Sequence, residues 1–324
     1  MLSRRGFLGA AGAAGLLAAA ACGSNESGKG PAGAVTVKHQ FGETTVPSPP
    51  KRVVSAGFTE QDNLLAVGVV PIAVTNWWGD QPFAVWPWAQ PKLGAAQPVV
   101  LSLTDGLQFD QIATLKPDLI VATNAGLDQD GYKRLSAIAP TIAQTSGQPP
   151  FFEPWKAQAN AIGQAVFQAD QMRSLVAQID NRFTELGKTN PQFGGKKVLI
   201  LQGTFYQDNV IATRKGWRTE FLNQMGIDVP DTIDAFKVDD RAFLPRDQAV
   251  EALDAADALI WKTESDDEEK RLVADPMFQR LKATKQNRNL FTGKDLSGAI
   301  AFSSPLSLPV VADQLTPMLS KVLS

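Results

Sequence analysis

Cysteine and histidine are almost absent from this 324-residue chain, which has one of each, Cys22 and His39. A single cysteine excludes an internal disulfide, and with one histidine it is too little for a nitrogen and sulfur metal site. A Ser-His-Asp relay has no suitable base, because His39 lies in a predicted hairpin away from the loops at strand ends. No Gly-x-Ser-x-Gly elbow, phosphate-binding loop or Gly-x-Gly-x-x-Gly turn is present. The sequence therefore argues against an enzyme, and it predicts no catalytic residue, no metal ligand and no cofactor.

A surplus of positive charge is also missing. The formal net charge is −2, and it becomes −4 if residues 1–21, which hold two arginines and no acid, are removed. Broad nucleic-acid binding needs a basic surface, so no nucleic-acid partner is expected.

The chain lacks an apolar run long enough for a transmembrane helix, although its first residues come near to one. Gly6–Ala21 is uncharged but shorter than the roughly 20 residues that cross a bilayer. It follows the pair Arg4 and Arg5 and ends in small residues, which is the layout of a secretory signal. The twin arginine also resembles an export signal of the twin-arginine type. We therefore predict that residues 1–21 are a signal peptide.

The end of this segment predicts a lipid anchor. Leu17–Cys22 resembles a bacterial lipobox, with Ala19 where Leu is commoner. By this resemblance Cys22 becomes the diacylated N-terminus of the mature chain; a free thiol is the alternative. Two acyl chains hold a protein firmly on a membrane. Residues 22–34, rich in Gly, Ser, Pro and Ala, are then expected to form a flexible tether.

Beyond the tether, short apolar strands alternate with helical segments, which predicts an α/β fold with mostly parallel sheets. The clearest strands are Arg52–Ala56, Pro71–Thr75, Asp118–Ala122, Lys197–Leu201 and Ala258–Trp261, after a short hairpin in residues 35–46. From Pro154 to about Leu186 the apolar residues recur at helical spacing without a strand signal, which predicts one long helix. We expect an N-terminal lobe (35–150), a linking helix (151–192) and a C-terminal lobe (193–324) that ends in a helix near Leu306–Leu323.

A weak internal repeat supports two similar lobes. Phe109–Thr123, FDQIATLKPDLIVAT, matches Arg246–Thr263, RDQAVEALDAADALIWKT, with a small insertion. In each copy Asp-Gln opens a short helix and a later Asp leads a buried strand. The match predicts a duplicated helix–strand unit.

Four stretches together resemble the ferric-siderophore substrate-binding proteins of bacterial ABC importers. They are PKRVVSAGFTEQDNLLAVGVVPIAV, DQIATLKPDLIVA, DPMFQRLKATKQNRNLF and AIAFSSPLSLPVVADQL, of which LKPDLI (115–120) is the most specific. The resemblance implies two lobes bridged by a rigid helix, a ligand in the cleft between them, and limited closure. The wider family also carries haem and cobalamin, so the fold alone does not identify the ligand.

In open α/β sheets, ligands bind beyond the carboxyl ends of the strands. In the N-terminal lobe the loops at these positions carry Phe58, Trp77, Trp78 and Asn124. Exposed aromatic residues often mark a binding surface. The alternative for the two tryptophans is a hydrophobic plug, together with Trp86 and Trp88, under the proline-rich loop that follows.

In the C-terminal lobe the candidate ligand contacts are Tyr206, Arg214, Trp217, Arg218, Arg241 and, before the last helix, Phe302. Arginine offers a planar, permanently charged fork to catecholate, carboxylate or hydroxamate oxygens, and Trp217 adds an aromatic face. The alternative for the arginines is pairing with surface acids. Trp155 is expected to be a packing residue.

Arg52 is expected to be structural, because it lies at the start of its strand, opposite the cleft.

The family resemblance also implies one carboxylate on each lobe that docks into arginine pockets of the permease. Asp110 matches the first position, where the family usually has Glu, and Asp247 matches the second, with Glu251 as an alternative. Helix capping alone is the other role that suits Asp110 and Asp247.

Three functions therefore remain open from the sequence. The chain is expected to be a monomeric, lipid-anchored extracytoplasmic receptor that binds a ferric siderophore and delivers it to an ABC permease. The second hypothesis is a haem or cobalamin carrier of the same fold, with Tyr206 as the ligand of haem iron. The third is a surface interaction protein without a transport role.

Overall fold

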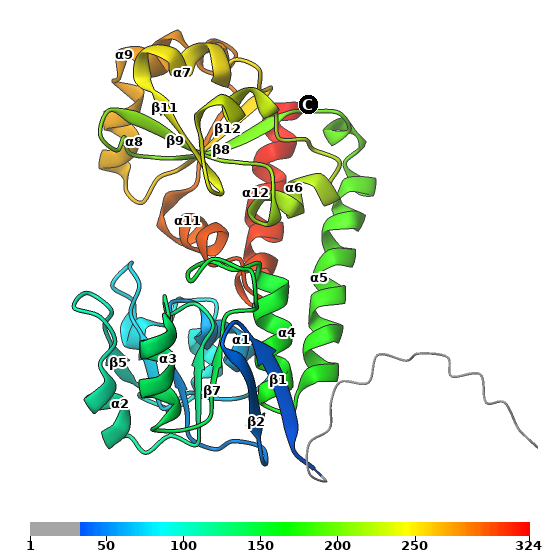
Figure 1. The fold of residues 1–324 in the computed structure, drawn as a ribbon. Coiled ribbons are helices and arrows are strands. Elements are labelled where there is room, and N and C mark those ends of the chain that lie inside the picture. The colour runs from blue at the N-terminus through cyan, green and yellow to red at the C-terminus, as the bar shows by residue number, and fades with distance from the viewer. Residues whose placement is uncertain (1–32) are drawn as a thin grey trace, which may run out of the picture.

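A computed structural model describes residues 33–324, so Cys22 and the predicted signal peptide lie outside the described residues. Two α/β lobes lie one above the other, and helices join them along one side (Figure 1). Within residues 33–324, no helix is both long and apolar enough to cross a bilayer.

The N-terminal lobe is built on a five-stranded sheet in the order β5-β4-β3-β6-β7, with all neighbours parallel. Its strands are β3 (Val53–Ser55), β4 (Ala73–Thr75), β5 (Val99–Leu101), β6 (Leu119–Ala122) and β7 (Thr141–Ala143). The helices between them are α1 (Glu60–Ala66), α2 (Phe109–Thr114) and α3 (Gln129–Ser136), with short 3₁₀ turns at Pro82–Ala84 (η1) and Gln90–Lys92 (η2). Strands β3 and β6 are wholly buried, as expected for a parallel sheet covered on both faces.

The predicted hairpin is confirmed as β1 (Val35–His39) and β2 (Gly42–Val46). His39 is buried in the hairpin, and its Nε2 atom lies 2.9 Å from the hydroxyl oxygen of Thr44.

The structural role predicted for Arg52 is confirmed as well. Its Nε and Nη2 atoms donate to the carbonyl oxygens of Lys116 and Leu115, which tie the start of β3 to the α2–β6 turn.

The C-terminal lobe differs from the expected parallel sheet. Its strand order is β10-β11-β9-β8-β12-β13, in which β8, β12 and β13 are parallel and the other neighbours are antiparallel. The strands are β8 (Val198–Gln202), β9 (Asn209–Thr213), β10 (Lys237–Val238), β11 (Arg241–Pro245), β12 (Ala258–Lys262) and β13 (Asn289–Phe291). Polar residues and Pro245 flank β9 and β11, so their short apolar cores give little strand signal. Arg241, one of the candidate ligand contacts, is the first residue of β11.

The remaining elements of this lobe are mostly short helices. They are η3 (Pro191–Phe193), η4 (Trp217–Thr219), α6 (Glu220–Gln224), η5 (Asp231–Phe236), α7 (Arg246–Leu253), α8 (Asp266–Val273), α9 (Pro276–Arg280) and α10 (Lys282–Lys285).

The linking segment folds as two helices, α4 (Trp155–Ala165) and α5 (Ala169–Thr189), which corrects the prediction of one long helix. Phe167 adopts a left-handed backbone (φ 62°) at the break. The two helices pack closely, since a Cβ atom on Gly163 would lie 2.6 Å from Cβ of Met172. Both helices carry the same apolar period, so periodicity alone does not reveal the break. Of these two helices, α5 is the one that spans the lobes (Figure 1).

The C-terminal residues form a second connection between the lobes. Helices α11 (Gly293–Phe302) and α12 (Ser307–Leu323) follow β13, and their junction reaches the N-terminal lobe. There the hydroxyl group of Ser304 donates to Oδ2 of Asp62 on α1 at 2.5 Å. One hydrophobic core also runs from the N-terminal sheet (Leu119) through α4 and α5 (Ile162, Phe183) to the C-terminal sheet. The lobes are therefore joined by packed side chains as well as by the backbone.

The internal repeat corresponds to equivalent elements, α2–β6 and α7–β12. The Asp that leads the strand has the same role in both copies. Asp118 accepts backbone N–H groups from Lys51 and Arg52 at the start of β3, each at 2.8 Å. Asp257 accepts the N–H of Lys197 at the start of β8 at 2.9 Å. In both copies the aspartate directly before the strand therefore holds the start of the neighbouring strand.

Candidate ligand-binding site between the lobes

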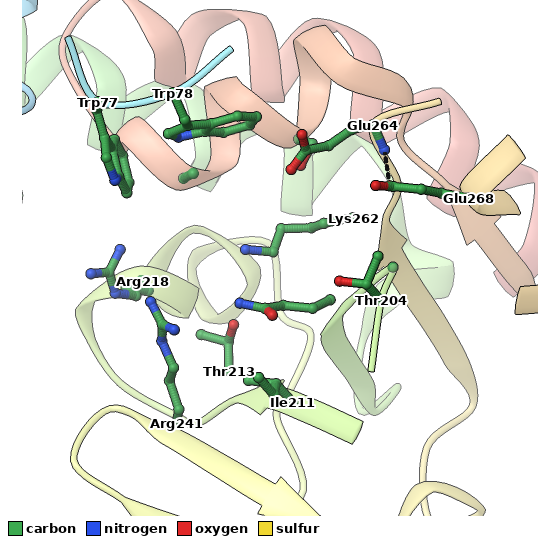
Figure 2. Close-up of a pocket in the computed structure, with 14 residues that line it drawn as sticks. Trp77, Trp78, Thr204, Ile211, Thr213, Arg218, Arg241, Lys262, Glu264 and Glu268 are labelled. Carbon is green, nitrogen blue, oxygen red and sulfur yellow. Dashed lines mark hydrogen bonds between the residues drawn. The ribbon is translucent and has the colours of Figure 1, made fainter. Parts of the chain in front are cut away.

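A cavity of about 180 Å³ lies between the lobes (Figure 2). The N-terminal lobe contributes Trp77 and Trp78, from the loop after β4. The C-terminal portion contributes Gln202, Gly203, Thr204, Ile211, Thr213, Arg218, Arg241, Lys262, Glu264, Glu268, Ser297 and Ala301. Gln202 and Lys262 are register partners at the carboxyl ends of the parallel strands β8 and β12. The cavity therefore lies where the strand-end rule predicts a ligand.

The N-terminal wall of the site is aromatic. Trp77 stacks on Phe58 with ring centroids 5.6 Å apart and contacts Phe152 at 5.2 Å. Trp78 packs edge-on against Trp86 at 4.9 Å. Trp77 and Trp78 line the cavity, while Trp86 beneath them is 1% exposed, so a buried plug lies under a partly open aromatic wall.

Three cations line the opposite side. Arg218 stacks on Trp217, with its Cζ atom 4.2 Å from the ring centroid, and its guanidinium pairs with Asp240. Its Nη2 group is buried without a hydrogen-bond partner. Arg241 lies further from Asp240, with 3.9 Å between Nε and Oδ1. Burial lowers the pKa of Arg218, and Asp240 opposes this shift. Donors of both arginines thus remain available to a ligand.

Lys262 is the third cation and is half-buried at the end of β12. Burial lowers the pKa of its ammonium group, and the positive charges of Arg218 and Arg241 act in the same direction. Together they bring the pKa to about 8. Figure 2 shows its amine directed into the space between the tryptophans and the arginines.

Two carboxylates form the remaining edge. The backbone N–H of Glu264 donates to Oε2 of Glu268 at 2.7 Å. Partial burial and the charge of Glu268 raise the pKa of Glu264, while Lys262 acts in the opposite direction. The cavity is therefore cationic on one side and acidic at its rim.

The structure brings four predicted contacts to the cavity surface: Trp77, Trp78, Arg218 and Arg241. Four others lie directly behind it, Phe58 in the aromatic wall and Asn124, Trp217 and Phe302 around a small adjoining void.

Two predicted contacts lie outside the cavity lining. Tyr206 is at the tip of the β8–β9 hairpin and is 54% exposed. Arg214 binds Asp234 at 2.7 Å and the carbonyl oxygen of Asp239 at 2.7 Å. For Arg214 the structure therefore shows the alternative given by the sequence, which was pairing with a surface acid.

Asn124 positions the aromatic wall. Its Oδ1 accepts the backbone N–H of Phe152 at 2.7 Å, and its Nδ2 donates to the hydroxyl of Thr59 at 3.0 Å. Its own backbone N–H donates to Glu60 at 2.8 Å. Burial raises the pKa of the Glu60 carboxyl to about 7, although the hydrogen bond from the Asn124 backbone acts against this shift.

Phe302 is 4% exposed and packs against Trp77, Trp86 and Trp88 at 5.5–5.9 Å. Trp155 is 6% exposed and lies in the hydrophobic core, which confirms its packing role.

Sequence reasoning missed several residues of the site, chiefly Phe151, Phe152, Lys262, Glu264 and Glu268. Lys262 and Glu264 follow the strand that ends in Trp261, so the strand-end rule could have found them. The two phenylalanines follow Pro149 and Pro150, where only the tertiary contact with Phe58 shows their role.

The three docking candidates are exposed. Asp110 lies in the first turn of α2, Asp247 in the first turn of α7, and Glu251 one turn further along α7. Within residues 33–324 there is no group of three or more His, Cys, Asp or Glu side chains placed to hold a metal ion.

Comparison with known proteins gives consistent results. The profile of the family described as periplasmic binding protein matches residues 54–296. The crystal structure of a periplasmic solute binding protein from Mycobacterium smegmatis is 58% identical, with a TM-score of 0.86 over 91% of this chain and 100% of that one.

Two curated relatives are more distant. The Bacillus subtilis protein named "Probable siderophore-binding lipoprotein YfiY" is 27% identical over 77% of each chain. The Fe(3+) dicitrate-binding periplasmic protein FecB of Escherichia coli is 26% identical over 79% of this chain and 81% of its own.

Proposed function

The chain belongs to the periplasmic binding protein family, and we propose that it binds an iron(III)–siderophore complex between its lobes. The observation that carries this proposal is one cavity with a tryptophan wall opposite Arg218, Arg241 and Lys262. Aromatic faces suit the aromatic or amide groups of a siderophore, and cations suit its oxygens. The names of the two curated relatives, which ascribe siderophore and ferric dicitrate binding to those proteins, support the same ligand class.

We also propose that the protein works as a monomer outside the cytoplasmic membrane, held there by acyl chains on Cys22. It would deliver its ligand to an ABC permease through Asp110 and through Asp247 or Glu251. The exposure of all three carboxylates is compatible with docking.

The placement of Tyr206 favours a siderophore over haem. A haem ligand would have to lie at the cavity, whereas Tyr206 is at an exposed hairpin tip. The cavity is also smaller than the roughly 300–1,000 Å³ of sites for drug-sized ligands. We therefore expect the lobes or the lining side chains to move apart when ligand enters.

Tryptophan fluorescence tests the ligand class, because Trp77 and Trp78 line the cavity. The purified full-length protein would be titrated with ferric catecholate, ferric hydroxamate, ferric citrate, haem and cobalamin. We expect saturable quenching by at least one ferric siderophore. Quenching by haem or cobalamin alone would replace the proposal with the second hypothesis, and no response to any ligand would favour a surface interaction protein.

Replacement of the lone cysteine tests the anchor. Wild type and Cys22→Ser would be expressed in a bacterium that carries the lipoprotein pathway and compared by detergent phase partitioning. Wild type is expected in the detergent phase and C22S in the aqueous phase. Equal partitioning of the two would reject lipidation at Cys22.

A further inference from the structure

Lys262 differs from the other two cations of the cavity in its partners. Arg218 pairs with Asp240, and Arg241 lies within 4 Å of the same carboxylate. Among residues 33–324, no carboxylate lies within ion-pair distance of Lys262, and its ammonium group donates no hydrogen bond. It is thus the cation of the cavity that lacks a direct counter-charge.

The charged groups that face Lys262 come from several elements of the same lobe. Arg218 on η4 and Arg241 on β11 repel its positive charge, whereas Asp240, in the turn before β11, and Glu264, after β12, attract it. Glu268 on α8 also lines the cavity.

The other lining side chains add no charge. Gln202, its register partner on β8, is neutral, and the N-terminal lobe presents Trp77 and Trp78. In the ligand-free cavity the ammonium form is therefore disfavoured by burial and by two arginines, and two more distant carboxylates only partly offset this.

An anionic ligand would change this balance, because it would bring negative charge between the three cations. Building on the proposed function, we propose that in alkaline solution Lys262 couples capture of an anionic ferric siderophore to the uptake of one proton. The amine takes the proton from water as the ligand enters and becomes its third cationic contact. The cavity accordingly prefers anionic ferric complexes to neutral ones, and its affinity for them falls in alkaline solution.

The sign of the pH dependence follows from the lowered pKa of about 8 in the free protein. Below pH 8 the lysine is charged in both states, so affinity is at its highest. As the pH rises through 8, the free protein loses the proton that the complex keeps. If the ligand raises the pKa by about two units, the Kd rises about tenfold between pH 7 and pH 9.

The test measures the Kd of the full-length protein at pH 7, 8 and 9 with ferric tris-catecholate, ferric dicitrate and neutral ferric tris-hydroxamate. Three variants accompany wild type: Lys262→Arg, which stays charged throughout, Lys262→Gln, which is never charged, and Lys270→Gln as a matched control. Lys270 lies on α8 in the same lobe, and its side chain is 74% exposed. The protonation of the ligand itself changes with pH in the same way for every variant. Comparing the pH dependence of the Kd in wild type and in K262R therefore cancels the contribution of the ligand.

One of the two anionic complexes, ferric tris-catecholate or ferric dicitrate, will bind more tightly than the other. We expect wild type and K270Q to bind that complex about tenfold more weakly at pH 9 than at pH 7. K262R is expected to give the same Kd at both values, and K262Q to bind weakly at both. Calorimetry of wild type at pH 8, in two buffers with different ionisation enthalpies, should show proton uptake on binding.

Three results would overturn the inference while leaving the proposed function intact. They are equal pH slopes in wild type and K262R, no proton uptake, or tighter binding of the neutral complex. Failure of every ferric complex to bind would instead reject the proposed function.

Discussion

The indole N–H of Trp88 donates to Oδ2 of Asp62 across 2.7 Å, at a carboxylate that is 0% exposed. The same oxygen accepts a hydrogen bond from the hydroxyl of Ser304. One buried carboxylate on α1 therefore holds both the loop of Trp88 and the α11–α12 junction. The other oxygen, Oδ1, has no hydrogen-bond partner. Burial therefore dominates and raises the pKa of Asp62 to about 6, although both donors act against the shift.

This raised pKa predicts an unusual pH dependence of stability. Because the folded state binds the proton more tightly than the unfolded state, the contribution of Asp62 declines as the pH rises from its unfolded value through about 6. Between pH 5 and pH 7.5 the loss is about 1.4 kcal/mol. Urea unfolding at the two pH values should show that Asp62→Asn reduces the difference by about this amount. An unchanged difference in D62N would mean that Asp62 is ionised at both values.

Replacement of Trp77 is predicted to weaken ligand binding, whereas replacement of Trp86 is predicted to lower the stability of the fold. Trp77 is half-buried in the cavity wall, whereas Trp86 is 1% exposed beneath it. Trp86→Ala should lower the free energy of unfolding by about 3–5 kcal/mol, as expected for a large buried side chain. Trp77→Ala should unfold at nearly the wild-type urea concentration but bind ferric siderophore at least about fivefold more weakly, since stacking on one aromatic ring contributes about 1–3 kcal/mol. Equal ligand affinity in W77A and wild type would remove Trp77 from the site.

Arg218 and Arg214 form a second matched pair. Arg218 faces the cavity, whereas Arg214 is engaged by Asp234 and the carbonyl oxygen of Asp239 outside it. Arg218→Ala should weaken ligand binding about 10- to 100-fold, through loss of a charge-assisted contact. Arg214→Ala should leave the Kd within about twofold of wild type. The reverse ranking in a fluorescence titration would place the anion contact at Arg214.

Gly298 should tolerate no side chain, because α11 packs directly on Trp86. A Cβ atom there would lie 2.6 Å from the Cη2 and Cζ3 ring atoms. Gly298→Ala is therefore expected to destabilise the protein by about 1–3 kcal/mol, since the buried ring has little room to move. Gly216→Ala is the control, with an extended backbone and no atom within 4 Å of the added group. Thermal unfolding of both variants measures the effect, and equal midpoints would contradict it.

Permease docking is tested in cells that carry the cognate importer. Asp110→Ala and Asp247→Ala, combined, should reduce uptake of the iron complex about tenfold or more through loss of charge complementarity, while the Kd of the purified protein stays unchanged. Asp130→Ala, on the exposed surface of α3, is the control for a lost surface charge. Normal uptake by the double variant would exclude both aspartates from permease docking.

Much of the fold follows from local pattern. The apolar runs that became β3, β6, β8 and β12 are buried strands, and the apolar period of residues 155–186 is helical. These features depend on neighbouring residues, which share a face or a strand and so leave a signature in a short window. The strand-end rule also pointed to the loop of Trp77 and Trp78, and both side chains line the cavity.

Tertiary structure decided which of the candidate side chains meet. Tyr206 follows β8 and Lys262 ends β12 of the same sheet. Only Lys262 lines the cavity, because β8 turns into an antiparallel hairpin that carries Tyr206 away. Phe302 is buried because the chain returns to the N-terminal lobe between α11 and α12. The break at Phe167 likewise depends on how closely α5 packs on α4. Such contacts join residues far apart in the chain, so the sequence determined the elements and their buried faces, while the packing of the two lobes determined the site.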